Sequence, residues 1–121
     1  MRISLCLFAL FAPMVAGAAE PTIAEMDRLA KASHERDSAY EMQAVKSFFG
    51  NGSVLRKCVP SDGPTPEPFV IYQEILPDGR PGRSLYAPVT ETAKCLQAAT
   101  ADLEYPKPDQ AYVIEIKFSI K

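Results

Sequence analysis

The sequence predicts an α+β fold in which an N-terminal helical part is followed by a small antiparallel sheet. Three observations lead to this prediction. Apolar residues recur at helical spacing after residue 22, whereas residues 112–121 alternate between apolar and polar types. Between these segments, a stretch rich in β-branched and aromatic residues is followed by a turn with proline and glycine and then by a shorter stretch that would complete a hairpin.

Residues 1–18 have the composition of a secretory signal peptide. Arg2 supplies the positive start, an apolar run covers residues 5–15, and small residues then offer a cleavage site after Ala18. The run is shorter than the roughly 20 apolar residues of a membrane-spanning helix, so a retained anchor is the alternative. We therefore expect a periplasmic protein without stable membrane insertion, and residues 19–121 would suit one small domain.

Three cysteines occur in the chain, and cleavage would remove Cys6. In an oxidising compartment the remaining pair, Cys58 and Cys95, is typical of one disulfide. Two free buried thiols and a metal site are the alternatives. The single histidine, His34, lies far from both cysteines in sequence, which argues against the metal site.

The charge balance excludes some classes of partner. The chain has a formal net charge of −2 at pH 7, and removal of Arg2 makes it one unit more negative. Because nucleic acids and anionic membrane surfaces select basic patches, we expect neither as a partner.

Residues 19–50 are predicted to be helical. Thr22 and Glu25 have the spacing of a capping box, and apolar residues then recur every three to four positions. A wholly polar stretch at residues 33–37 leaves open whether this is one long helix or two short ones. The Gly-Asn-Gly sequence at residues 50–52 should end it, because both residue types adopt the left-handed conformation of a helix stop.

Residues 51–121 are predicted to form the α+β part. Ser53 is expected to cap a short helical turn that reaches Cys58. Four prolines at residues 60–68 exclude a helix or a central strand, so this segment is predicted to be an exposed loop.

Residues 69–76 and 84–87 are predicted to pair as a hairpin. In the turn at residues 77–80, proline presets φ and glycine takes a positive φ. Pro81 and Pro88 place the second strand at an edge of the sheet, because proline has no N–H to donate.

The remaining elements are a helix and a final strand. Thr90 is expected to cap a helix that runs to about Leu103, and the prolines of residues 105–108 then break it. Residues 112–121 predict a strand with one buried and one solvated face. The predicted buried residues are Tyr112, Ile114, Ile116, Phe118 and Ile120. The predicted solvated residues are Val113, Glu115, Lys117, Ser119 and Lys121.

Four features occur in the order expected of one known protein superfamily: Cys58, the sequence ILPDGR at residues 75–80, Cys95, and the sequence EYPKPD at residues 104–109. With them, the chain from about residue 49 onward resembles the TonB C-terminal domain-like superfamily, closest to the AgmX-type branch with a cysteine pair. The resemblance implies a β-α-β fold, a bond between these two cysteines and a protein-binding role in the envelope. Energy transduction by TonB needs an uncleaved anchor and a long proline-rich linker, neither of which we expect here.

No catalytic constellation is recognisable. The sequence has no G-x-S-x-G elbow, no H-E-x-x-H motif and no glycine-rich phosphate loop. His34 is expected on a solvated helix surface. The carboxylates of Asp62, Glu67, Glu74 and Asp78 could pair for acid–base chemistry, but scattered acidic residues of this kind are more often solvated, and we expect that here. We therefore expect no enzyme, no cofactor and no metal, and a small enzyme that uses His34 is the alternative.

The final strand is the predicted partner-binding element. At a sheet edge, its unpaired N–H and C=O groups could accept a strand from an envelope or secreted protein. We expect this contact at Tyr112, Val113, Glu115 and Lys117; a homodimer through the same edge, or an edge merely protected by charge, is the alternative. The second function considered is an inhibitor or immunity protein against a secreted hydrolase or toxin, inserting residues 60–68.

Overall fold

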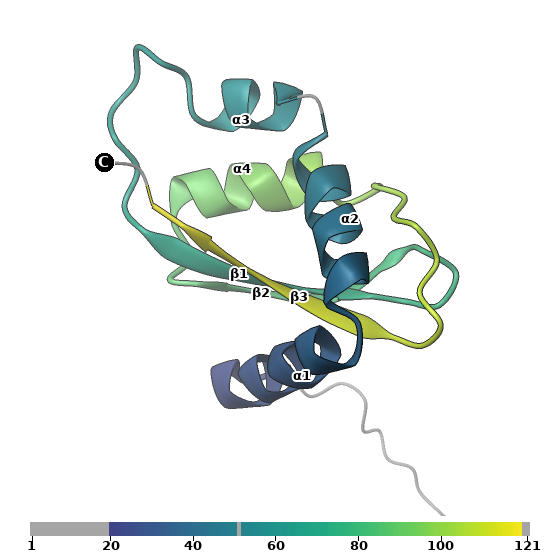
Figure 1. Ribbon diagram of the computed structural model, residues 1–121. Helices are drawn as coiled ribbons and strands as arrows, with labels where there is room; N and C mark the ends of the chain where they lie inside the picture. The colour runs from purple at the N-terminus through teal and green to yellow at the C-terminus, as the bar shows by residue number, and fades with distance from the viewer. Residues whose placement is uncertain (1–19, 51, 120–121) are drawn as a thin grey trace, which may run out of the picture.

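The computed structural model describes residues 20–50 and 52–119, so the predicted signal peptide lies outside the described residues. A three-stranded antiparallel sheet lies between two helical layers, with α1 on one face and α2, α3 and α4 on the other (Figure 1). The elements in chain order are α1 (Ile23–Arg36), α2 (Ser38–Phe49), α3 (Ser53–Cys58), β1 (Phe69–Ile75), β2 (Pro81–Ala87), α4 (Glu91–Ala99) and β3 (Tyr112–Phe118).

The N-terminal helical part consists of two helices. The hydroxyl of Thr22 accepts a hydrogen bond of 3.1 Å from the backbone N–H of Glu25, which confirms the predicted cap of α1. Asp37 ends α1 and caps α2, since its carboxylate accepts from the backbone N–H of Tyr40 at 3.1 Å. Gly50, with a φ of 58°, ends α2 as predicted.

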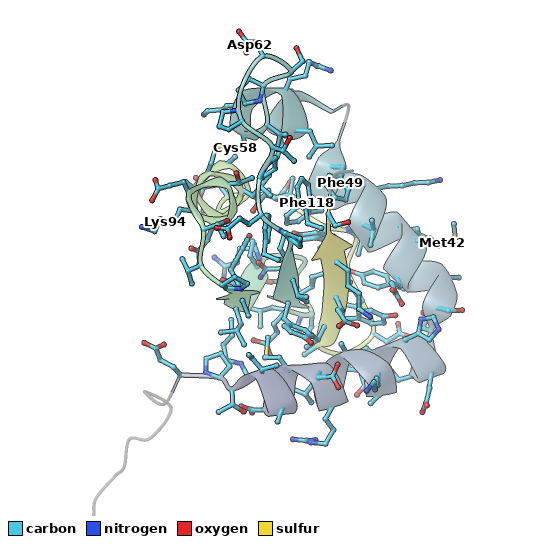
Figure 2. The ribbon with its side chains drawn as sticks, turned by 90° about the vertical axis from the view of Figure 1, so that its left-hand side faces the viewer. Met42, Phe49, Cys58, Asp62, Lys94 and Phe118 are labelled. Atoms are coloured by element: carbon cyan, nitrogen blue, oxygen red, sulfur yellow. A yellow bond between two sulfur atoms is a disulfide. The ribbon has the colours of Figure 1, made fainter. Side chains whose placement is uncertain are left out.

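The expected cap of α3 is wrong. Ser53 is the first residue inside this helix, and Gly52 takes the N-cap position in the left-handed conformation, with a φ of 89° and no side-chain hydrogen bond. Residues 60–68, here called the proline loop, contain no helix or strand and are largely exposed, as predicted. The loop projects from the end of the molecule that carries α3, with Asp62 at its tip (Figure 2).

The sheet has the order β2-β1-β3, so β2 and β3 are both edge strands. Ile71 of β1 pairs with Tyr86 of β2 on one side and with Ile116 of β3 on the other. β2 begins at Pro81 rather than at residue 84, because an edge strand tolerates a residue that donates no ladder hydrogen bond. The predicted turn is present, with Gly79 at a φ of 87°.

The second predicted helix is shorter than expected. Thr90 caps α4 by accepting from the backbone N–H of Ala93 at 3.1 Å. The helix ends at Ala99 instead of Leu103. The buried hydroxyl of Thr100 there donates to the carbonyl of Leu96 at 2.8 Å, and the chain tightens into a turn.

The main core lies between the sheet and the layer of α2, α3 and α4. It contains aromatic and aliphatic side chains from both layers, among them Tyr40, Phe48, Phe69, Ile71, Tyr86, Leu96, Tyr112 and Ile114. A disulfide joins Cys58 at the end of α3 to Cys95 in α4, with a Cα–Cα distance of 5.6 Å. This confirms the predicted pairing and fastens the short helix α3 to the rest of the core.

A second cluster forms where α1 docks on the opposite face of the sheet. Met26 and Ala30 of α1 pack against Tyr72 of β1 and Val113 of β3. The prediction that Val113 faces solvent is therefore wrong, since its exposed fraction is 4%. The helix α1 has an apolar stripe, and burying it against the less apolar face of the sheet also covers Val113.

None of the helices in the described part of the chain combines the length and the apolar character that a membrane crossing requires.

Candidate partner-binding site at the sheet edge

The outer edge of β3 carries backbone groups that point away from β1. The N–H of Val113 is one of them, because it donates to the hydroxyl of Ser33 on α1 at 3.1 Å. In an antiparallel strand this direction alternates with every residue, so the N–H and C=O groups of Glu115 and Lys117 point outward too. Across residues 20–50 and 52–119, no hydrogen bond to these outward groups is found.

The beginning of β3 is closed by the corner between α1 and α2. Besides the bond from Ser33, the guanidinium of Arg36 donates to the carbonyl of Ala111 at 3.2 Å. The hydroxyl of Tyr112 donates to the carbonyl of Asp37 at 2.6 Å. Figure 1 shows α1 and α2 meeting beside this end of the strand. Two of the predicted contact residues, Tyr112 and Val113, are therefore buried and support the edge from within.

The other two predicted contact residues lie at the open end. Lys117 is exposed, and Glu115 is half-buried on the face that α1 covers. The hydroxyl of Tyr72 lies 3.1 Å from Glu115 and 3.3 Å from Asp27. Burial, together with these two carboxylates, raises the pKa of Tyr72 to about 12. The contact with Tyr72 holds Glu115 against the sheet.

Two hollows continue from this edge. The first, here called the notch, has a volume of about 310 Å³ and is lined by Ala30, Lys31, His34, Glu35, Glu41 and Glu115. The second, here called the α2 hollow, has a volume of about 600 Å³ and is lined by Ser38, Ala39, Met42, Val45 and Lys46 together with His34 and Glu41. Because both hollows include His34 and Glu41, they adjoin at this pair.

His34 is exposed on α1, where it was expected, but its partner was not foreseen. Its Nδ1 atom lies 2.5 Å from Oε1 of Glu41 on α2. Only the change of direction at Asp37 brings the two helices together at this point. Met42 was also missed, although the sequence holds a signal for it: it lies off the helical face of α2 that Tyr40 begins, and 65% of it is exposed.

The carboxylates considered for acid–base chemistry do not come together. Glu74 forms an ion pair with Arg83 on β2 at 3.1 Å, and Asp78 pairs with Arg80 within the turn at 2.9 Å. Asp62 and Glu67 are exposed on the proline loop. Within the part of the chain that the structure describes, no group of three or more histidine, cysteine or acidic side chains is placed to hold a metal ion.

The proline loop is the second surface considered. It begins just after the disulfide at Cys58 and ends where β1 starts at Phe69, so both ends are anchored in the core. The N–H of Gly63 donates to the carbonyl of Pro60 at 3.1 Å, which closes a turn near the tip. The loop is thus an exposed segment with a restrained base.

Comparison with protein-family models, with curated proteins and with solved structures finds no match to this chain. The open end of β3, the notch and the α2 hollow form one continuous surface of backbone groups, carboxylates and apolar side chains. Such a surface suits an extended peptide better than a small reactant. Its hydrogen-bonding groups are spaced along the strand, whereas a site for a small reactant has polar groups that converge on one position.

Proposed function

We propose that this protein is an exported, periplasmic interaction module that binds an extended segment of an envelope or secreted protein by strand addition to the open end of β3. The observation that carries the proposal is the outward, unpaired backbone of Glu115 and Lys117 at a sheet edge. Edges of this kind accept a further strand through main-chain hydrogen bonds. Tyr112 and Val113 then have the role of supporting the edge.

The proposal includes a TonB C-terminal-like type for residues 51–121. Its support is the succession of hairpin, α4, proline-containing segment and β3, with a disulfide between Cys58 and Cys95. The helices α1 and α2 precede this part; they lie on opposite faces of the sheet, and the corner between them closes the beginning of the edge strand.

The proposed role is binding and not catalysis. His34 pairs with Glu41 instead of a nucleophile, and Cys58 and Cys95 are consumed in the disulfide. The carboxylates of Glu74 and Asp78 are each neutralised by an arginine. These contacts explain the five side chains structurally without assigning them a reaction.

Replacement of Lys117 tests strand addition, because the N–H of this residue points outward. Lys117→Pro removes that N–H while leaving the ladder to β1 intact, which an edge strand tolerates. Lys117→Ala is the matched control, since it removes the charge and keeps the N–H. A photo-crosslinking side chain at Ser119, which is exposed, reports the neighbour of the edge in the periplasm.

We expect one heterologous adduct that persists in Lys117→Ala and disappears in Lys117→Pro. Equal adducts in both variants would show that no strand pairs at this edge. An adduct between two copies of the chain would identify a homodimer in place of the proposed partner, and an absence of any adduct would contradict the proposal.

A second candidate function is an inhibitor or immunity protein against a secreted hydrolase or toxin. The observation that favours it is the restrained proline loop, which projects from the molecule between the disulfide and β1 (Figure 2). Prolines reduce the conformational entropy that a loop loses on binding. Replacing Pro64 and Pro66 by glycine should then weaken binding, whereas Lys117→Pro should leave it unchanged.

A further inference from the structure

We infer that the segment bound at this edge carries an aliphatic side chain flanked by lysine or arginine, with the α2 hollow taking the aliphatic group and the notch taking the cation. This inference rests on the proposed strand addition and adds the chemistry of the partner to it. It is carried by the path that the helical corner imposes, by the charges of the notch and by the apolar lining of the α2 hollow.

The helical corner determines where a bound segment must leave the strand. Pairing can proceed along Lys117 and Glu115, but the next outward N–H, that of Val113, is already bonded to Ser33. Arg36 occupies the carbonyl of Ala111 in the same way. A segment that runs in this direction therefore leaves the edge beside Glu115 and enters the notch, and the α2 hollow follows directly because both hollows share His34.

The notch has an excess of negative charge. Three carboxylates line it, those of Glu35, Glu41 and Glu115. The ammonium group of Lys31, its one lysine, lies 2.8 Å from Asp27 and is neutralised there. His34 contributes a ring nitrogen 2.5 Å from Glu41. A cationic side chain from a partner is the complement of this arrangement, and electrostatic complementarity favours specificity at such surfaces.

The α2 hollow is lined mainly by apolar atoms. Ala39, Met42 and Val45 follow one another along the outer side of α2. Met42 is 65% exposed and points away from the body of the protein (Figure 2). The flexible thioether side chain adapts to varied apolar partners, so an aliphatic side chain of the segment is the fitting occupant.

A second copy of the chain fits this edge less well than a peptide does. Antiparallel pairing centred on Ile116 would place Glu115 of one copy opposite Lys117 of the other, which is favourable. The same register would place Ser119 opposite Val113, whose N–H is already bonded to Ser33. The closed corner therefore interrupts the pairing of two copies at both ends.

Three matched synthetic peptides test the inference by fluorescence anisotropy with the purified protein. Each is a fluorescein-labelled, threonine- and valine-rich extended peptide, and the three differ only in a central Lys-Leu-Lys, Glu-Leu-Glu or Lys-Thr-Lys. Because the leucine has the same residue on both sides, a flanking side chain can reach the notch whichever way the peptide runs along β3. We expect the Lys-Leu-Lys peptide to bind about tenfold more tightly than either of the others.

Protein variants assign the preference to the two hollows. Glu41→Gln should reduce the preference for Lys-Leu-Lys over Glu-Leu-Glu, and Met42→Gln should reduce the preference for leucine over threonine. Glu91→Gln is the matched control for charge, because Glu91 lies on α4 with its side chain 92% exposed. This control should change neither preference.

The outcomes separate the inference from the proposed function. If all three peptides bind equally and Lys117→Pro abolishes their binding, strand addition holds and the inferred partner chemistry is overturned. If peptides bind but Lys117→Pro has no effect, strand addition itself is overturned. If none of the peptides binds, or if sedimentation shows a dimer that Lys117→Pro dissociates, the inferred partner is wrong.

Discussion

The hydroxyl of Ser33 on α1 accepts a hydrogen bond of 3.1 Å from the backbone N–H of Val113 on β3. Both residues are buried, and they are separated by 80 positions in the sequence. An unpaired N–H at this depth would cost free energy comparable to a lost hydrogen bond. The hydroxyl of Ser33 thus takes up the outward N–H at the closed end of β3, so an incoming strand cannot pair with the edge beyond this point.

Ser33→Ala should lower the free energy of unfolding by about 1–3 kcal/mol, because the N–H of Val113 would lose its partner in a buried site. Urea denaturation followed by circular dichroism measures this change. Ser38→Ala, at an exposed position of α2, is the control for placing alanine in a helix. Equal stability of the two variants would contradict the role given to Ser33.

Removal of the disulfide should destabilise the protein by about 4 kcal/mol in the chain-entropy model, since the bond closes a loop with a sequence separation of 37. The test is denaturation of a variant in which Cys58 and Cys95 are both replaced by alanine. Reduction should destabilise the wild type and leave the double variant unchanged. Alkylation of both thiols in the untreated protein would show that the bond does not form.

Acid should remove the contribution of the Glu74–Arg83 pair. Burial alone would raise the pKa of Glu74, but hydrogen bonds from the side chain and backbone of Arg83, with its charge, outweigh burial and hold the pKa below its ordinary value of 4.5. A lowered pKa in the folded state stabilises the protein above pH 4.5, and this stabilisation is lost as the pH falls through the lowered value.

Arg83→Met should therefore cost about 1 kcal/mol at neutral pH, and the difference from the wild type should shrink as the pH falls below 4.5. Chemical denaturation across this pH range gives both curves. Arg28→Met, on the exposed side of α1, should leave the pH dependence unchanged. A difference that stays constant with pH would show that Glu74 does not titrate against Arg83.

Two buried tyrosines should respond in opposite ways to loss of the hydroxyl. The hydroxyl of Tyr40 donates to the carbonyl of Pro106 at 2.5 Å, so Tyr40→Phe should cost about 1 kcal/mol. The hydroxyl of Tyr105 is buried and has no hydrogen-bond partner among the described residues, so Tyr105→Phe should be neutral or stabilising. Thermal unfolding of both variants tests this contrast, and equal losses would contradict it.

Much of the local structure follows from short-range chemistry that can be read from a few neighbouring residues. Thr22 and Thr90 cap their helices as predicted, because a hydroxyl reaches an N–H three residues later whatever the rest of the chain does. Gly79 forms the hairpin turn because glycine adopts a positive φ without steric cost, which depends only on its own backbone. Two predictions were wrong where neighbouring residues can fill the same role. Gly52, and not Ser53, is the N-cap of α3, and α4 ends before Thr100 instead of continuing to Leu103.

The candidate site was predictable in part. Alternation along β3 correctly indicated a strand that contains Glu115 and Lys117, and the cysteine count indicated the disulfide. The notch and the α2 hollow were not foreseen, because His34 and Glu41 belong to different helices and meet only through the turn at Asp37.

The sequence by itself determined the order of helical and strand segments, the helix caps at Thr22 and Thr90, the hairpin turn and the cysteine pair, but it left open whether the N-terminal part forms one helix or two. Tertiary structure alone decided that β3 lies at an edge, that α1 covers Val113, and that Ser33 closes one end of that edge. The reason is physical: helix and turn formation depend on neighbours along the chain, whereas the choice of which apolar faces meet depends on the burial of surfaces from distant segments.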